Sequence, residues 1–163
     1  MSTHPVDSLF KYYQCSLILS GELKNIMDII NTPPVEIKLK PWGREIWFAH
    51  SENYAGKILE ITKGHRYSLQ YHEKKRETQY LFSGKVKLIY GKDKDDLKEQ
   101  ILNPGDKVEV HPYIIHRLEA IEDSQVFEVS TADLDDVVKL EDDYGRSGKG
   151  NDENLDTHLH NTI

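Results

Sequence analysis

Four side chains with the chemistry of metal ligands lie at regular spacing in this sequence. Gln70 and His72 are separated by one residue, Glu77 follows five positions after His72, and His116 comes later in the chain. An amide oxygen, a carboxylate and two imidazoles form a mixed oxygen and nitrogen set, which suits one divalent ion: Zn²⁺, Mn²⁺, Fe²⁺, Ni²⁺ or Co²⁺, with no choice among them. An amide at position 70 makes a weaker, harder site than a histidine there would make.

The spacing of these residues favours a common site on a β-structure. Side chains alternate between the two faces of a strand, so Gln70 and His72 share one face. A charged turn follows, and a hairpin would bring Glu77 opposite His72 on the returning strand. His116 faces inward from a neighbouring strand in the same pattern. A single buried histidine is more often structural than a ligand, but four residues at this spacing predict a metal site.

The segments that must position these residues are short β runs. Between residues 35 and 131 they are separated by turn signals such as Lys63-Gly64, Ser83-Gly84 and Asn103-Pro104-Gly105. With no helical stretch between them, they predict an all-β antiparallel sandwich or barrel. The runs are VEIKLK, REIWFAH, GKILEIT, RYSLQYH, TQYLFSG, KVKLIYG, EQILN, DKVEVH, HRLEAI and QVFEVS.

The two ends of the chain differ from the β-rich middle in their sequence pattern. Apolar residues at roughly helical spacing in residues 1–31 indicate one or two short helices, so residues 1–34 are expected to be a partly helical or disordered extension. Met27 is an alternative start. The domain itself is expected over residues 35–146. The polar, Gly- and Asn-rich residues 147–163 predict a disordered tail, in which His158 and His160 are solvated.

Bulk properties limit the function classes. The 163 residues suit one domain, with 37% hydrophobic and 30% charged residues. The net charge of −7 argues against a general nucleic-acid binder but leaves anionic small molecules open. No apolar run is long enough to cross a membrane. The lone Cys15 excludes an internal disulfide and suits a cytoplasmic location.

The run from Gly64 to Gly84 resembles the first motif of the cupins. That motif has a glycine, five spacer residues, two ligands one residue apart, a glutamate and a closing glycine. The segment from Gly105 to His116 is similar to the second motif, although His111 and Tyr113 occupy its proline and glycine positions and Ala120 replaces its frequent final asparagine. The resemblance implies a cupin-type double-stranded β-helix, or jelly-roll barrel.

Within the cupins, Ser-Leu-Gln-x-His at residues 68–72 resembles the type II mannose-6-phosphate isomerases, including the isomerase portion of bifunctional mannose-1-phosphate guanylyltransferases. Lys40-Pro41-Trp42-Gly43, the run His116–Glu119 and the closing Glu141–Arg146 are similar to further motifs of that family. Together the matches cover residues 40–146. They imply a metal-dependent isomerase that interconverts mannose 6-phosphate and fructose 6-phosphate through an enediol, with metal ligands Gln70, His72, Glu77 and His116.

The same resemblance and the positions of charged residues suggest further site residues. The catalytic candidates are His111, Lys57 and Arg146. The substrate-binding candidates are Lys40, Trp42, Arg66 and Arg117. Two alternatives stay open: a cupin isomerase or epimerase acting on another sugar phosphate or nucleotide sugar, and a non-catalytic carbohydrate-binding cupin. Because cupins commonly pair through sheet edges, a homodimer is expected.

Overall fold

The structure is a computed structural model that describes residues 34–162. The helical extension predicted for residues 1–31 lies outside the described residues. Within residues 34–162, no helix is long and apolar enough to span a bilayer.

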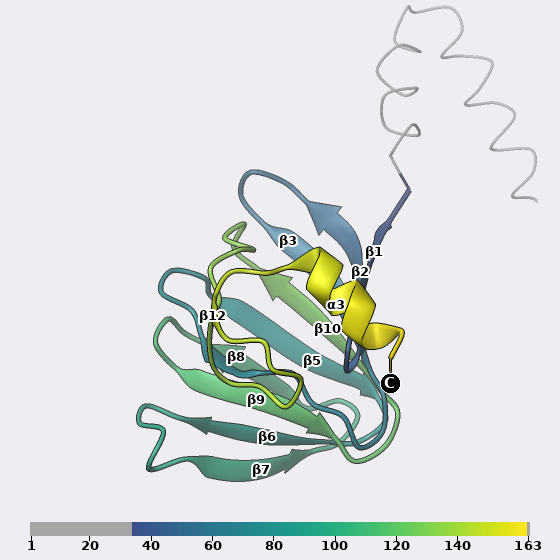
Figure 1. The fold of residues 1–163 in the computed structure, drawn as a ribbon. Helices are drawn as coiled ribbons and strands as arrows, with labels where there is room; N and C mark the ends of the chain where they lie inside the picture. The colour runs from purple at the N-terminus through teal and green to yellow at the C-terminus, as the bar shows by residue number, and fades with distance from the viewer. Residues whose placement is uncertain (1–33, 163) are drawn as a thin grey trace, which may run out of the picture. The chain divides into compact units, whose positions relative to one another are not determined.

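The described chain is built from two six-stranded antiparallel sheets (Figure 1). All ten β runs expected from the sequence form strands, and the all-β prediction is confirmed. The first sheet has the order β1 (Glu36–Lys40), β2 (Gly43–His50), β3 (Ala55–Ile61), β10 (Ser124–Ser130), β5 (Glu77–Ser83) and β8 (Lys107–Val110). The second has the order β12 (Gly148–Lys149), β11 (Val138–Glu141), β4 (Leu69–Tyr71), β9 (Ile115–Ala120), β6 (Val86–Gly91) and β7 (Lys98–Leu102).

Some consecutive strands pair with each other in one sheet, such as β1, β2 and β3, whereas others change from one sheet to the other. Strand β4 belongs to the second sheet and β5 to the first, so the predicted hairpin that pairs Gln70 and His72 with Glu77 is wrong. Instead, β4 pairs with β9, which places Gln70 directly opposite His116. Glu77 therefore approaches His72 from the facing sheet, and the ligands meet in the interior between the two layers.

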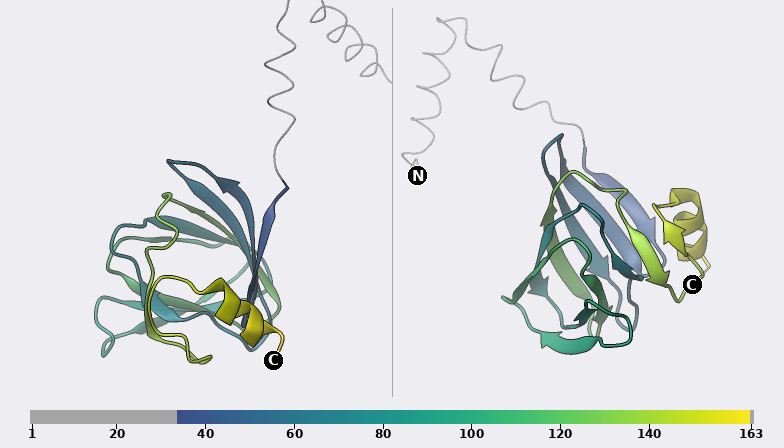
Figure 2. Two further views of the ribbon diagram at one scale, coloured as in Figure 1. Left: turned by 45° about the horizontal axis from the view of Figure 1, so that its top comes forward. Right: turned by 90° about the vertical axis from the view of Figure 1, so that its left-hand side faces the viewer.

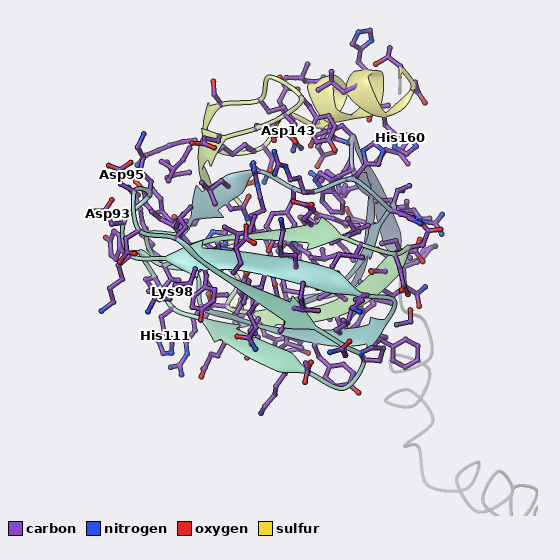
Figure 3. The ribbon with its side chains drawn as sticks, turned by 90° about the horizontal axis from the view of Figure 1, so that it is seen from below. Asp93, Asp95, Lys98, His111, Asp143 and His160 are labelled. Carbon is purple, nitrogen blue, oxygen red and sulfur yellow. The ribbon has the colours of Figure 1, made fainter. Side chains whose placement is uncertain are left out.

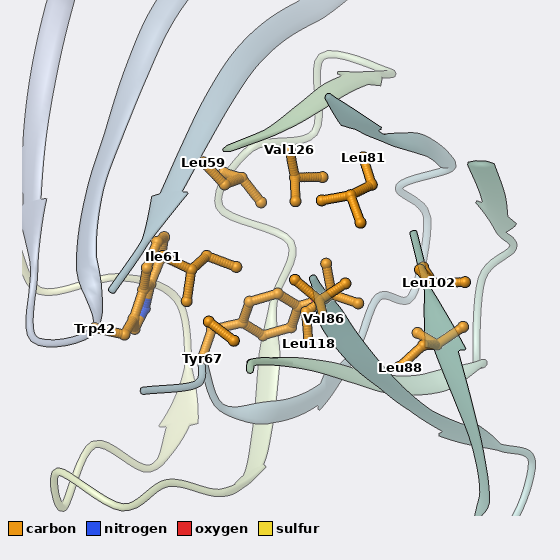
Figure 4. Packing of buried hydrophobic residues seen from close by; sticks show 11 residues of the cluster. Trp42, Leu59, Ile61, Tyr67, Leu81, Val86, Leu88, Leu102, Leu118 and Val126 are labelled. Carbon is orange, nitrogen blue, oxygen red and sulfur yellow. The ribbon is translucent and has the colours of Figure 1, made fainter. Parts of the chain in front are cut away.

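The apolar core lies between the sheets and is shown in Figure 4. Inward-facing residues of both sheets contribute to it, and burial of each large apolar side chain is worth about 1.5–3 kcal/mol. Trp42 is part of this core, with its ring 6.2 Å from that of Tyr67 in an edge-on arrangement. The cluster consists of Trp42, Leu59, Ile61, Tyr67, Leu81, Val86, Leu88, Leu102, Leu118, Ala120 and Val126.

The C-terminal segment is ordered, contrary to the predicted disordered tail. Strand β12 and helix α3 (Glu153–His160) follow the barrel, and α3 lies beside β1 (Figures 1 and 2). The Asp152 side chain caps the helix by accepting a hydrogen bond from the Leu155 N–H, 3.0 Å away. The disorder prediction failed because α3 is polar and is held by charged contacts, which hydrophobic patterning does not detect. His160, expected to be solvated, contacts the Lys40 carbonyl through Nδ1 at 2.8 Å.

Candidate metal centre

Three of the four expected ligands converge in the interior of the barrel. His72 follows β4, Glu77 begins β5, and His116 lies in β9, and all three side chains are buried. His116 Nε2 is 3.1 Å from Glu77 Oε1, and His72 Nε2 is 3.6 Å from Glu77 Oε2. Ligand atoms bound at about 2.0–2.1 Å to one ion lie roughly 3–3.4 Å apart, so these separations fit a shared ion with little adjustment.

The two imidazoles are oriented by backbone carbonyls. His72 Nδ1 contacts the Asp136 carbonyl, and His116 Nδ1 lies 3.0 Å from the Ile114 carbonyl. Because a carbonyl only accepts hydrogen bonds, each Nδ1 carries the proton and each Nε2 presents a lone pair. This second contact is the usual way in which metal-binding histidines are held.

The donor atoms themselves have no hydrogen-bond partner in the described part of the chain. His72 Nε2, His116 Nε2 and Glu77 Oε2 are all buried and unpaired in this sense. Two imidazole lone pairs facing a carboxylate are electron-rich groups in mutual contact, an arrangement that costs free energy unless a cation lies among them. The three residues therefore fit a divalent metal ion.

Lys75 is a fourth charged group at this centre. Its Nζ lies 2.5 Å from Glu77 Oε2, outside hydrogen-bond alignment, and 2.7 Å from Glu128 Oε1. Burial alone would raise the pKa of Glu77, but Lys75, His116 and His72 together outweigh burial and hold that pKa well below its usual value. Burial lowers the pKa of His72 to about 4, so its imidazole is neutral and able to bind metal near pH 7. Lys75 is thus buried, although the charged turn to which it belongs would be expected to be solvated.

Gln70 borders the same region. It lines the cavity beside His72, and its Oε1 accepts a hydrogen bond of 2.7 Å from Ser68 Oγ. That bond fixes the side chain while leaving a second lone pair on the amide oxygen. Gln70 as the fourth ligand remains a prediction.

A cavity rich in charged residues adjoins the metal centre and is lined by one of its three ligands, His72. Five cationic side chains line it, from both sheets and from the C-terminal segment: Lys40, Lys57, Lys75, Lys139 and Arg146. Glu45 and Glu128 line it as well. Burial alone would raise the pKa of Glu45, but Lys57 and Lys40 reverse this and lower the pKa to about 2. The cavity has a volume of about 50 Å³, and most of its cationic side chains lie beside ionised carboxylates.

Four of the residues expected to bind substrate or catalyse lie at this cavity. Lys57 Nζ is 3.3 Å from Glu45 Oε2 and 4.0 Å from Glu128 Oε1. Lys40 and Arg146 both pair with Asp156. Trp42 lines the cavity as well as packing in the core.

The other three expected residues lie elsewhere. The His111 side chain is 55% exposed, in the turn that leads to β9, and Figure 3 shows it at the edge of the molecule, away from α3. Arg66 pairs with Asp143 and Glu119. Arg117 donates to the carbonyls of Tyr67 and Glu141, so its guanidinium supports the backbone of the second sheet. None of the three lines the cavity, because each is directed to partners on the barrel wall or to solvent.

Several residues of the site were missed from the sequence. Glu45 and Glu128 occupy inward positions of strands that also carry apolar residues outward, Ile46 and Phe48 on β2 and Phe127 and Val129 on β10. The position of Glu128 between two outward apolar neighbours was a signal available in the sequence. Lys75, Gln79 and Asp156 were also missed. Gln79 Nε2 donates a hydrogen bond to Glu77 Oε1.

The fold is that of known structures with very different sequences. CapF with the inhibitor 3-isopropenyl-tropolone has a TM-score of 0.57 and 17% identity over 68% of this chain and 35% of that chain. KdgF from Halomonas sp. has a TM-score of 0.54 and 19% identity over 64% of this chain and 90% of that chain. Oxalate decarboxylase from Bacillus subtilis has a TM-score of 0.56 and 18% identity over 65% of this chain and 30% of that chain.

The chain thus spans about a third of the length of CapF and of oxalate decarboxylase. In sequence comparisons, no protein-family profile and no curated protein matches it. Likeness at this level of identity shows the fold alone. Together with the two antiparallel sheets, it shows that the described chain has the cupin-type double-stranded β-helix fold.

Proposed function

We propose that this chain is a metal-dependent sugar-phosphate isomerase that interconverts mannose 6-phosphate and fructose 6-phosphate through an enediol. One observation carries the proposal: a buried cluster of His72, Glu77 and His116, with three donor atoms that lack a hydrogen-bond partner, borders through His72 on a cavity lined by five cationic side chains. A neutral sugar would not require such a concentration of positive charge, whereas a phosphate would.

The residues that would bind the metal and the sugar phosphate come from both ends of the described chain. A divalent ion held by His72, Glu77 and His116, with Gln70 as a fourth ligand, would polarise the carbonyl and hydroxyl oxygens of the sugar. Lys40 and Arg146 line the cavity near the C-terminal segment and supply charge for the phosphate. Trp42 forms part of the wall.

Proton transfer between C1 and C2 needs a base that reaches a carbon-bound hydrogen. We assign it to Lys57 with the carboxylates of Glu45 and Glu128, which are 3.3 Å and 4.0 Å from its Nζ. One carboxylate takes the proton from C2 and returns it to C1. The Lys57 ammonium gives a proton to O1 as the enediol forms and regains one from the O2 hydroxyl as the C2 carbonyl forms. His111 has no part in this assignment.

The direct test is turnover of mannose 6-phosphate by the folded protein after Mn²⁺, Zn²⁺ or Co²⁺ is added. Lys57→Met is expected to abolish turnover while metal binding persists, and Lys63→Met, at an exposed position, is the matched control. No turnover with any of the three ions, in protein shown to have bound them, would overturn the proposal.

Two other functions would give distinct results in the same assays. An isomerase or epimerase of another sugar phosphate or nucleotide sugar would bind metal and convert that compound instead. A carbohydrate-binding cupin would bind its ligand tightly with or without a chelator and convert nothing. The cationic cavity favours a phosphorylated ligand in either case.

We also propose that the chain forms a homodimer, through the outer face of the first sheet rather than through the sheet edges. Apolar side chains lie directly across from one another on five adjacent strands of that face: Ile37, Ile46, Ile58, Phe127 and Tyr80. Phe82 and Val129, each 56% exposed, extend the row. A contiguous apolar row of exposed and half-buried side chains is typical of an interaction surface, and a second copy offers a matching one.

A further inference from the structure

Helix α3 is held to the barrel by a carboxylate. Asp156 is its one buried residue, at 2% exposure. The Asp156 Oδ2 atom lies 2.7 Å from Lys40 Nζ, and its Oδ1 atom lies 2.9 Å from Arg146 Nη1. The carboxylate therefore bridges two cations from distant parts of the chain.

The same two cations face the cavity beside the metal centre. A second cavity, of about 330 Å³, shares Arg146 with the first and is lined by Asp156 itself. Lys139, Arg146 and Asn151 line both cavities. Asp156 thus places an anionic group at the boundary of the cationic cavity, where it pairs with Lys40 and with Arg146, whose Nη2 also pairs with Asp142 at 2.6 Å.

Little else fixes the helix. Leu155 is 39% exposed, and the Lys38–Glu153 ion pair, at 2.9 Å, is formed with a largely exposed carboxylate. Surface ion pairs of this kind contribute about 0–1 kcal/mol. The His160 contact with the Lys40 carbonyl adds one hydrogen bond. The position of α3 therefore depends mainly on the bridge made by Asp156.

We propose that Asp156 occupies the subsite for the ligand's phosphate, and that phosphate binding displaces this carboxylate and releases α3 from β1. The inference rests on the proposed function in one respect, that the ligand is phosphorylated. Phosphate oxygens and a carboxylate accept hydrogen bonds from lysine and arginine in the same geometry, so the two compete for Lys40 and Arg146. Because coupling is reciprocal, a docked α3 weakens phosphate binding as much as bound phosphate loosens α3.

The test uses the full chain with a chelator present, so that metal makes no contribution, and inorganic phosphate as the probe. Asp156→Asn removes the charge at nearly constant volume. Glu153→Gln removes a charge from the same helix, away from the cavity, and is the matched control. Calorimetry should show phosphate binding that is tighter in Asp156→Asn by a factor of about 5 or more, with Glu153→Gln unchanged.

Hydrogen exchange provides the second readout and needs no variant. In the wild-type chain, phosphate should speed amide exchange over residues 153–160, while sodium chloride of equal ionic strength should not. In Asp156→Asn, exchange over these residues should be fast without phosphate. Circular dichroism and thermal unfolding check that the barrel of each variant is folded.

Three results would overturn the inference. In the first, phosphate binds but leaves exchange in α3 unchanged, which leaves the isomerase proposal intact. In the second, phosphate binds more weakly to Asp156→Asn, which makes Asp156 a residue that positions the cations for the ligand. In the third, neither protein binds phosphate. Conversely, displacement of α3 by phosphate in a chain without isomerase activity would keep this inference and reject only the proposed substrate.

Discussion

His116 Nε2 lies 3.1 Å from Glu77 Oε1, although His116 Nδ1 already faces the carbonyl of Ile114 at 3.0 Å. Because the proton is on Nδ1, His116 Nε2 has a lone pair and cannot donate a hydrogen bond to Glu77 Oε1. The short separation therefore brings two hydrogen-bond acceptors together. His72 repeats the arrangement on the other carboxylate oxygen, at 3.6 Å. The two imidazole lone pairs and the Glu77 carboxylate thus surround a position that favours a positive charge. Among the described residues, Lys75 supplies part of that charge.

Loss of either of two ligands should remove the metal. We expect Glu77→Gln and His116→Ala to lose stoichiometric Zn²⁺ or Mn²⁺, measured by elemental analysis after dialysis. His111→Ala is the matched control, because that histidine is exposed and outside the site, and it should keep the metal. Full metal content in Glu77→Gln or His116→Ala, with the fold verified by circular dichroism, would move the site elsewhere.

The amide of Gln70 should contribute less than the charged or imidazole ligands. We expect Gln70→Ala to weaken metal binding in calorimetry by roughly 10-fold or more, without abolishing it, because three ligands remain. Ser68→Ala removes the hydrogen bond that orients the amide oxygen and should give a smaller loss. An unchanged affinity in Gln70→Ala would show that position 70 does not ligate the ion.

Glu45 should make stability depend on pH in the acid range. Its folded-state pKa of about 2 is below the value of 4.5 expected when unfolded. The stabilisation is therefore fully present above about pH 4.5 and is lost as the pH falls toward 2. The loss would be on the order of 3 kcal/mol, at about 1.4 kcal/mol per pH unit.

Denaturant unfolding at a series of pH values measures this dependence. Glu45→Gln should flatten the curve between pH 4.5 and 2 and should also lower stability at neutral pH, because Lys57 and Lys40 lose a buried partner. A wild-type curve already flat over that range would contradict the expectation.

The two glycines that bound the first cupin-like motif should respond differently to alanine. Both have positive φ, +80° for Gly64 and +85° for Gly84, which costs an alanine about 1–2 kcal/mol. A Cβ on Gly84 would also lie 2.3 Å from the Asp123 carbonyl oxygen, whereas a Cβ on Gly64 would have no neighbour within 4 Å. Gly84→Ala should therefore be clearly the more destabilising in thermal unfolding, and equal effects would refute this account.

The outer face of the first sheet should determine the association state. We expect a dimer at micromolar concentration by light scattering, and a monomer when Phe82→Arg places a charge in the apolar row. Ile101→Arg, at an exposed position on the other sheet, is the control and should leave the dimer intact. A wild-type monomer would reject the proposal, and a Phe82→Arg dimer would reject this face.

Much of the fold was predictable because it depends on local patterns. Alternation and turn residues identified the ten strands, since a strand needs only two faces and a break at each end. Strand β2 shows the limit of this reasoning. Glu45 faces the cavity beside Trp47, while Ile46 and Phe48 share the outer face with the exposed Arg44. Hydrophobicity alone does not assign the faces of that strand.

The residues able to bind a metal could be identified before folding is considered, because ligand type and spacing along strands are properties of the chain alone. The tertiary structure decided how they meet, across two sheets rather than in one hairpin. It also decided the roles of Lys75 and Asp156, which are buried only because carboxylates or cations from distant segments pair with them. A charged side chain tolerates burial only beside such partners, and these pairings exist only once the two sheets and α3 have packed together.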